Sequence, residues 1–131
     1  MAFNCVIVTP EQQLLDEQIT QAIVPAHDGL IGILTDRAPL LVKLGLGPLR
    51  IDLPGNQRRY FFIEGGIAQV KENRLTILTN EATPASEIDA EAARAEYAEA
   101  TARRIIDDRS FDERQRGLQR ARVKQELVRN S

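Results

Sequence analysis

Proline and glycine are distributed very unevenly along the chain, and this feature constrains the fold most. All six prolines and seven of the eight glycines lie in residues 1–84, and Gly117 alone falls in residues 85–131. Large apolar side chains follow the same division, with 31 before the boundary and nine after it. Because proline and glycine build turns and interrupt helices, the first segment must be rich in turns. The sequence therefore predicts two differently built domains, residues 1–84 and residues 85–131.

Short apolar runs between turn residues predict antiparallel strands throughout the first domain. Residues 49–53 alternate apolar and charged side chains, as a strand with one buried face does. The turn at 54–56 and the bend at 65–66 separate further runs. The other expected strands are residues 3–8, 18–24, 33–34, 40–44, 60–63, 67–70 and 75–78. About eight strands with no helical period between them predict an antiparallel β-sandwich or a flattened barrel.

The last 47 residues predict two antiparallel helices. Ser86 with Asp89, and Ser110 with Glu113, fit capping boxes, in which the serine accepts from free amides of the first helical turn. The short connection at 107–109 makes the two helices antiparallel neighbours. The expected facing side chains of the first helix are Ile88, Ala92, Ala95, Ala102, Ile105 and Ile106. Most of these side chains are small and bury little apolar area. The hairpin is therefore expected to be only weakly stabilised by its own packing.

Charge separates between the two expected helices. Residues 85–113 hold nine acids and four bases, whereas residues 114–131 hold six bases and one acid. One interpretation is that the helices attract each other when folded side by side, and that acidic starts and basic ends suit the helix dipoles. The other is that the bases meet an acidic surface on a partner, and both can hold at different times. The bases are Arg114, Arg116, Arg120, Arg122, Lys124 and Arg129.

The composition argues against several functional classes. A net charge of −2 argues against a nucleic-acid binder. One cysteine, Cys5, and one histidine, His27, supply neither a disulfide framework nor a multi-histidine metal site, so no metal and no cofactor is expected. The glycines at 45 and 47 precede a strand rather than a helix, which argues against a phosphate loop. Without a long apolar run or a signal-peptide pattern, a soluble cytoplasmic protein is expected.

A series of motifs runs along almost the whole chain. They are Val8-Thr9-Pro10-Glu11, Pro25 to Gly29, Gly32-Ile33-Leu34, Ala38-Pro39-Leu40-Leu41, Gly47-Pro48-Leu49-Arg50-Ile51, residues 62–70 with Gly65-Gly66, residues 73–78, Ile88-Asp89 and Leu118-Gln119-Arg120-Ala121. In this order and spacing they resemble the epsilon subunit family of bacterial and chloroplast F-type ATP synthases. The first domain also resembles the mitochondrial delta subunit.

The resemblance implies a non-catalytic rotor subunit of the central stalk. Its sandwich would bind the gamma subunit and the loops of the membrane c-ring, and would help to couple ion flow to rotation. Its C-terminal helices would leave the sandwich and reach the alpha/beta catalytic hexamer, where they impede ATP hydrolysis. The expected location is the cytoplasmic face of the bacterial inner membrane, as part of F1.

The resemblance also assigns candidate contact residues. The loop expected to face the c-ring holds Asp28, Gly29, Leu30, Ile31 and Arg37. Leu30 stands where the family often has an acid, and Arg37 where it often has histidine, so the details of this contact depart from the family pattern. The bases expected to meet the catalytic subunits are Arg114, Arg116, Arg120, Arg122 and Lys124.

Some members of that family bind ATP between the two helices through an I-D-x-x-R-A motif. Ile88 and Asp89 match this motif, but Ala92 replaces its arginine and Arg94 follows two positions later. Because the missing cation would pair with phosphate, weak or absent ATP binding is expected. Two other classes are less favoured: the single histidine disfavours a small cupin-like enzyme, and the missing arginine disfavours a free-standing nucleotide sensor.

Overall fold

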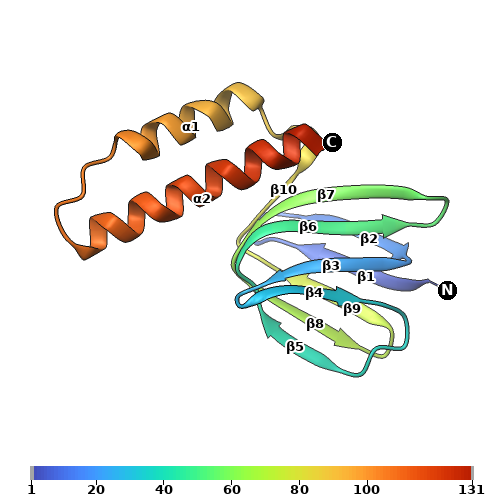
Figure 1. Cartoon of the computed structure of the whole chain (residues 1–131). Helices are drawn as coiled ribbons and strands as arrows, with labels where there is room; N and C mark the ends of the chain where they lie inside the picture. The colour runs from blue at the N-terminus through green and yellow to red at the C-terminus, as the bar shows by residue number, and fades with distance from the viewer. Residues whose placement is uncertain (1, 131) are drawn as a thin grey trace. The chain divides into compact units, whose positions relative to one another are not determined.

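The computed structural model describes residues 2–130, and the chain divides into two compact units, residues 1–84 and residues 85–131 (Figure 1). The first unit is a sandwich of two five-stranded β-sheets. The second unit contains one short 3-10 turn and two long helices. The predicted fold class, a β-sandwich followed by a helical hairpin, is confirmed.

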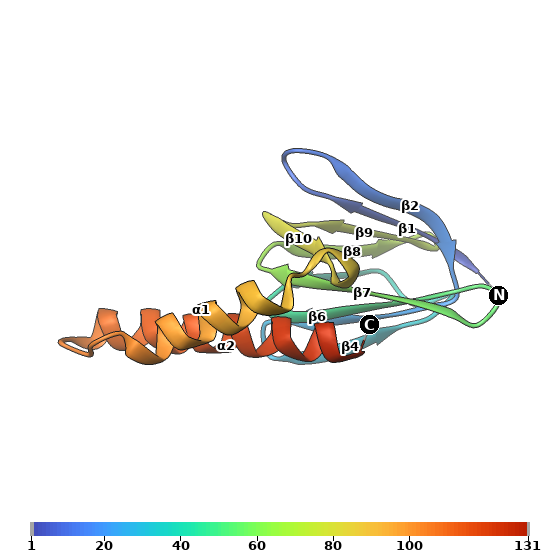
Figure 2. The same ribbon diagram turned by 90° about the horizontal axis from the view of Figure 1, so that it is seen from above.

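Each sheet of the sandwich has five strands. The first sheet contains, in spatial order, β2 (Gln13–Ile19), β1 (Phe3–Val8), β9 (Arg74–Leu78), β8 (Ile67–Lys71) and β5 (Leu40–Lys43). The second sheet contains β10 (Glu81–Pro84), β7 (Gln57–Glu64), β6 (Leu46–Leu53), β3 (Gln21–Ala26) and β4 (Gly29–Ile33). Paired neighbours are antiparallel, apart from the parallel pair β1 and β9. Figure 2 separates the layer with β1, β2 and β9 from the layer with β4, β6 and β7.

The core lies between the two sheets and follows the period-two pattern of the strands. In β6, Leu49 and Ile51 are fully buried, whereas Arg50 and Asp52 on the opposite face remain partly exposed. Cys5 of β1 is fully buried, and this burial raises the pKa of its thiol to about 12. The thiol therefore stays protonated near neutral pH and behaves as a small apolar side chain.

One predicted strand is wrong because the chain changes sheets in the middle of it. Residues 18–24 were expected to form one strand, but β2 ends at Ile19 and β3 begins at Gln21 in the other sheet. Thr20 makes the corner, since its N–H and its hydroxyl both donate to the carbonyl of Asp52, at 2.8 and 3.1 Å. Most of β2 and all of β10 were not predicted, because the first is rich in polar residues and the second is four residues long. The strand expected at residues 33–34 is also wrong in its bounds: β4 covers Gly29–Ile33, and its two glycines were interpreted as a turn.

A cluster of charged side chains lies on the outer face of the second sheet. Asp52 accepts from Nε and Nη2 of Arg50 at 3.0 and 2.9 Å, and from Nε of Arg58 at 3.0 Å. The bond from Arg50 is the main cause that lowers the pKa of Asp52, and Arg58 adds to it. The carboxylate thus ties β6 to β7 in its ionised form.

Replacing Asp52 by asparagine is expected to lower the free energy of unfolding by about 1 kcal/mol at pH 7. Because the folded-state pKa is depressed, the carboxylate stabilises the fold above its unfolded pKa of about 3.9. This contribution disappears as the pH falls through the lower folded-state pKa. In denaturant unfolding at a series of pH values, the stabilities of wild type and variant should therefore converge as the pH falls below the unfolded pKa and through the lowered folded-state pKa. Asp28→Asn, at an exposed turn, is the matched control, and a difference independent of pH would contradict the account.

The second unit contains η1 (Ala85–Glu87), α1 (Ala90–Ala102) and α2 (Asp108–Asn130). Both predicted helix starts are wrong by a few residues. Ser86 lies in η1, and the N-cap of α1 is Asp89, whose carboxylate accepts from Glu91 N–H at 2.9 Å.

The second helix begins with a different capping box, in which Asp107 and Ser110 take the place of the expected Ser110 and Glu113. The carboxylate of Asp107 accepts from Ser110 N–H at 2.7 Å, and the Ser110 hydroxyl accepts from Asp107 N–H at 3.0 Å. Ser110 therefore lies inside the first turn of α2, and Asp107 takes the role of N-cap. The bonds from Ser110 lower the pKa of Asp107.

The predicted facing side of α1 is also wrong by one position. Ala92, Ala95 and Ala102 are exposed, whereas Ala93 and Ala100 are buried. Ile105 and Ile106 were expected in the interface but are 52% and 80% exposed, because they lie in the linker after α1 has ended.

Gly117 of α2 has a packing role that its sequence context did not reveal. A Cβ placed there would come 3.1 Å from the Cβ of Ala100, which is tighter than an ordinary contact. The glycine therefore lets the two helices approach closely, and Ala93, Ala100, Gly117 and Ala121 form a line of small residues between them.

Candidate functional site

Five connections between strands lie at the same end of the sandwich, which we call the tip end. They are residues 9–12, 27–28, 44–45, 65–66 and 79–80. Backbone hydrogen bonds connect these segments. The N–H of His27 donates to the carbonyl of Lys43, at the end of β5, at 3.0 Å, and the N–H of Leu44 donates to the carbonyl of Gly66 at 2.8 Å. The buried Thr79 hydroxyl donates to the carbonyl of Gly65 at 2.6 Å. The tip end is thus a tied cluster of short links, suited to presenting a fixed surface.

Four of the residues predicted to face the c-ring lie at or next to the tip end. Asp28 occupies the two-residue turn between β3 and β4, and Gly29 opens β4 with φ of +144°. Leu30 is 65% exposed on this edge strand. Ile31 points the other way and packs against the core, so its side chain is not part of the outer surface.

Arg37 is not brought together with these residues. It lies in the loop from β4 to β5, at the opposite end of the sandwich. That loop is held to the turn between β8 and β9, because Asp36 N–H donates to Asn73 Oδ1 at 2.7 Å and Asn73 Nδ2 donates back to Asp36 at 3.0 Å. Five strand residues, about 17 Å of chain, separate Arg37 from the turn at Asp28.

The outer face of the first sheet is apolar near the tip end. Ile67 and Leu78 pair across β8 and β9, and Val8 pairs with Leu78 across β1 and β9. Ile67 is 40% exposed, Leu78 is 44% exposed, and Leu41 of the neighbouring β5 is 67% exposed. An exposed apolar group of this kind marks an interaction surface in many proteins, and sequence periodicity alone did not single it out.

In the hairpin, the most distinctive group of side chains joins the two helices. Glu96 of α1 accepts from Nε of Arg120 at 3.2 Å and from Nζ of Lys124 at 3.1 Å, both on α2. All three side chains are less than a third exposed. Burial lowers the pKa of Arg120. We call this group the Glu96 clamp.

The clamp divides the predicted partner-binding bases into groups. Arg120 and Lys124 face α1 and belong to the clamp. Arg114 lies near the linker and donates to the carbonyl of Thr101 at 3.4 Å, while Arg116 and Arg122 are exposed. Sequence reasoning did not identify Glu96, because its partners are 24 and 28 residues away and no local pattern connects them.

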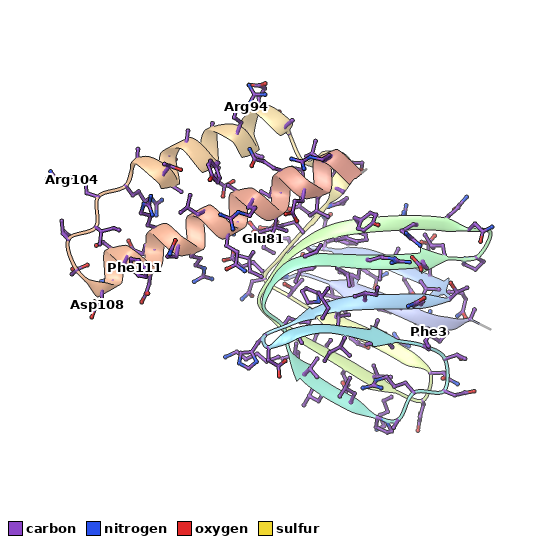
Figure 3. The ribbon with its side chains drawn as sticks, viewed as in Figure 1. Phe3, Glu81, Arg94, Arg104, Asp108 and Phe111 are labelled. Atoms are coloured by element: carbon purple, nitrogen blue, oxygen red, sulfur yellow. The ribbon has the colours of Figure 1, made fainter. Side chains whose placement is uncertain are left out.

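The remnant of the ATP motif does not form one cluster with the clamp. Asp89 caps α1, and the N–H of Ile88 donates to Ala85 at 3.2 Å. Arg94 projects from α1 away from α2 (Figure 3), and its nearest acid is Glu91 at 3.6 Å. A hollow of about 190 Å³ between the helices is lined by acids and bases alike, including Glu96, Glu113, Arg103 and Arg116. Weak or absent ATP binding stays a prediction.

Comparison with known proteins identifies the family. Residues 2–85 match the family described as "ATP synthase, Delta/Epsilon chain, beta-sandwich domain". The ATP synthase epsilon chain of Rhodopirellula baltica is 38% identical over 100 residues, which cover 76% of this chain and 77% of that one. The chloroplastic epsilon chain of Cucumis sativus is 34% identical over 131 residues, covering 98% of this chain and 96% of that one, so the similarity includes the hairpin.

Two solved structures show the same fold at lower identity. A chain of the Euglena gracilis mitochondrial ATP synthase (OSCP/F1/c-ring) superimposes with a TM-score of 0.87 at 22% identity, covering 97% of this chain and 81% of that one. A chain of the Tetrahymena thermophila central stalk/c-ring gives 0.67 at 17% identity, with 94% and 93% covered. In the described residues, neither helix has the length and apolar character needed to cross a membrane. On the match of residues 2–85 and these relatives, the chain belongs to the ATP synthase delta/epsilon chain family.

Proposed function

We propose that this chain is a non-catalytic central-stalk subunit of an F-type ATP synthase, in which the sandwich docks on the rotor and the hairpin restrains ATP hydrolysis. Its relatives are named ATP synthase epsilon chains, and the two similar structures are titled as F1/c-ring and central stalk/c-ring assemblies. The proposed partners are the gamma subunit, the c-ring loops and the alpha/beta hexamer. The proposed location is the membrane face that carries F1, which is the cytoplasmic face in a bacterium.

The sandwich offers two surfaces for this docking. Asp28, Gly29 and Leu30 present an exposed turn and edge that suit contact with a c-ring loop, whereas Arg37 would need a separate contact. The exposed apolar group of Leu41, Ile67 and Leu78 suits a larger apolar contact with the gamma subunit. Because the tip end is tied by backbone bonds, it transmits rotation without having to be ordered first.

The construction of the hairpin is the observation that carries the regulatory part of the proposal. Small residues line the contact between α1 and α2, and Leu127 is the one large apolar side chain that is fully buried in the described part of the hairpin, so opening the hairpin exposes little apolar area. The clamp is a polar link between the two helices, and opening the hairpin separates Arg120 and Lys124 from Glu96. Such a hairpin can open at a moderate cost in free energy, and the open form then presents the basic side chains of α2.

Removal of residues 85–131 tests the regulatory role. A chain ending at Pro84 should still join a complex depleted of this subunit, and the rate of ATP hydrolysis should rise above that with the full chain. Retention of the truncated chain on the complex must be measured alongside. Equal inhibition by both chains would remove the hairpin from the mechanism, and failure of both to join would refute the proposed function.

Charge reversal at Arg122 tests the contact with the catalytic hexamer separately from the clamp. Arg122 is exposed, so Arg122→Glu should leave the helical content unchanged. Loss of a pair with an acidic partner surface costs about 1 kcal/mol, or roughly fivefold in the concentration needed for half-inhibition. Arg104→Glu, in the exposed linker, makes the same charge change and is the control. If the two variants inhibit equally, Arg122 makes no such contact.

A further inference from the structure

The linker between α1 and α2, residues 103–107, contains none of the residues that usually end a helix. Residues 85–116 include neither proline nor glycine. The chain leaves α1 at Arg103 with φ of −64° and ψ of 137°, rather than through a residue of positive φ. Helices commonly end at a glycine in the left-handed conformation or shortly before a proline. The sequence of the linker therefore permits the helix to continue, and other contacts must end it at Ala102.

Apolar packing does not hold the linker in its extended form. All residues from 101 to 109 are exposed, and the large apolar side chains of Ile105 and Ile106 are 52% and 80% exposed. Arg104 projects from the linker away from both helices (Figure 3). A segment with so little buried surface has low local stability, and its shape depends on polar contacts.

Ser110 supplies these polar contacts. Its hydroxyl accepts from the N–H groups of Ile106 and Asp107, at 2.8 and 3.0 Å, and donates to the carbonyl of Asp107 at 3.0 Å. Its own N–H donates to the carboxylate of Asp107 at 2.7 Å. In a continuous helix, the first two N–H groups would instead donate to the carbonyls of Ala102 and Arg103, four residues earlier. One hydroxyl thus takes the place of two helical acceptors. We call these four bonds the Ser110 latch.

The charges of the linker also have the spacing of a helix. Arg103 and Asp107 are four residues apart, and so are Arg104 and Asp108. Opposite charges at this spacing stabilise a helix. The linker therefore has two competing arrangements, one held by the Ser110 latch and one helical, and each has its own polar contacts.

We propose that the hairpin opens by helix continuation through this linker. Residues 103–107 become helical, and α1 and α2 join into one helix of about 40 residues, roughly 60 Å long. The Ser110 latch and the Glu96 clamp favour the folded-back form. Helix continuation replaces the bonds of the latch with helical ones, whereas a flexible hinge leaves the same groups to water. This inference rests on the proposed function for its role in regulation, but the conformational change belongs to the chain alone.

The distance between two labelled positions in the full chain tests the proposal. Arg94→Cys and Arg122→Cys place spin labels at exposed positions of the two helices. Cys5 is not labelled, because it is fully buried and burial raises the pKa of its thiol to about 12. Neighbouring helices hold the labels roughly 10–20 Å apart, whereas roughly 28 residues of continuous helix separate them by about 42 Å. Glu96→Gln, which loosens the clamp, should reveal the longer distance as a narrow second peak.

Two further substitutions in the Glu96→Gln chain test the latch and the helix separately. Ser110→Ala removes the hydroxyl, and the population at the long distance should rise about fivefold, as expected for the loss of an N-cap contact. Arg104→Pro should lower that population about a hundredfold, because proline interrupts a helix. Proline suits the folded-back form, since Arg103 already has the extended backbone that precedes a proline. Arg104→Ala removes the same exposed side chain but can stay helical, so this matched control should keep the long distance.

The Cα chemical shifts of residues 103–107 should become helical in proportion to the long-distance population. A broad range of distances that Arg104→Pro leaves unchanged would overturn the proposal in favour of a flexible hinge. A long-distance population that Ser110→Ala does not raise would overturn the role of the latch. If the chain with both Glu96→Gln and Ser110→Ala shows only the short distance, the hairpin does not open at this linker. These measurements use the isolated chain, so they are independent of the truncation experiment that tests the proposed function.

Discussion

Gly66→Ala is expected to destabilise the sandwich by about 4 kcal/mol or more, which is a large part of the stability of a small domain. Gly66 has φ of +110°, and a Cβ on it would overlap the carbonyl oxygen of Leu78 and come 2.7 Å from the Cα of Thr79. These contacts are backbone atoms, so no side-chain rotation relieves them. The strand link must move, and its bond to Leu44 N–H would be disturbed.

Thermal unfolding of the full chain measures this effect. A loss of about 4 kcal/mol in a domain of this size lowers the melting temperature by roughly 15–30 °C. Gly65→Ala is the matched control, because Gly65 also has a positive φ, +77°, but a Cβ there meets no atom within 4 Å. Backbone strain alone should cost that variant about 1–2 kcal/mol. Equal melting temperatures for the two variants would mean that the overlap at Gly66 is relieved by a small shift.

The sequence could predict the parts of the fold that rest on local pattern. The alternation in residues 49–53 identified β6 and its buried face, and the glycines at 65–66 identified the link between β7 and β8. The corner at Thr20 could not be predicted, because it is made by bonds to Asp52, 32 residues away. Without proline or glycine there, residues 18–24 read as one strand.

In the hairpin, the buried face of α1 and the partners of Glu96 could not be predicted, for a different reason. Its first helix is rich in alanine, so neighbouring faces differ little in apolar character and the buried face was assigned one position away from Ala93 and Ala100. Glu96, a carboxylate, lies on the interface with the partner helix, where a pattern search expects an apolar residue. In the same way, the predicted tip residues included Ile31, because sequence alone did not give the direction of its side chain.

The two units consequently depend on different kinds of contact. The sandwich has a core of large apolar side chains between its sheets, including Phe61, Ile63 and Leu75. The hairpin instead buries small residues, one charged group and, among its described residues, a single large apolar side chain, Leu127. Burial of large side chains contributes far more to stability than burial of alanine does. A single change at the clamp should therefore shift the hairpin without affecting the sandwich.

Glu96→Gln is expected to weaken the contact between α1 and α2 by about 1–2 kcal/mol, between the values for exposed and fully buried ion pairs. The amide keeps one acceptor oxygen but sets its NH₂ group against a cation, so either Arg120 or Lys124 loses its partner in the clamp. The population of open hairpin should rise by roughly 5–30-fold. Faster amide exchange in residues 90–102, with unchanged exchange in the sandwich, measures this directly.

The effect of Glu96→Gln on catalysis follows from which form of the hairpin inhibits. If the open form inhibits, as proposed, the variant should inhibit ATP hydrolysis more strongly than wild type, whereas truncation at Pro84 abolishes inhibition. Glu99→Gln is the matched control, because Glu99 is 72% exposed and pairs with Arg103 at the end of its own helix, at 3.4 Å. Such a pair contributes about 0.3–0.5 kcal/mol, so this variant should inhibit as wild type does. Weaker inhibition by Glu96→Gln, with normal binding to the complex, would instead make the closed hairpin the inhibitory form.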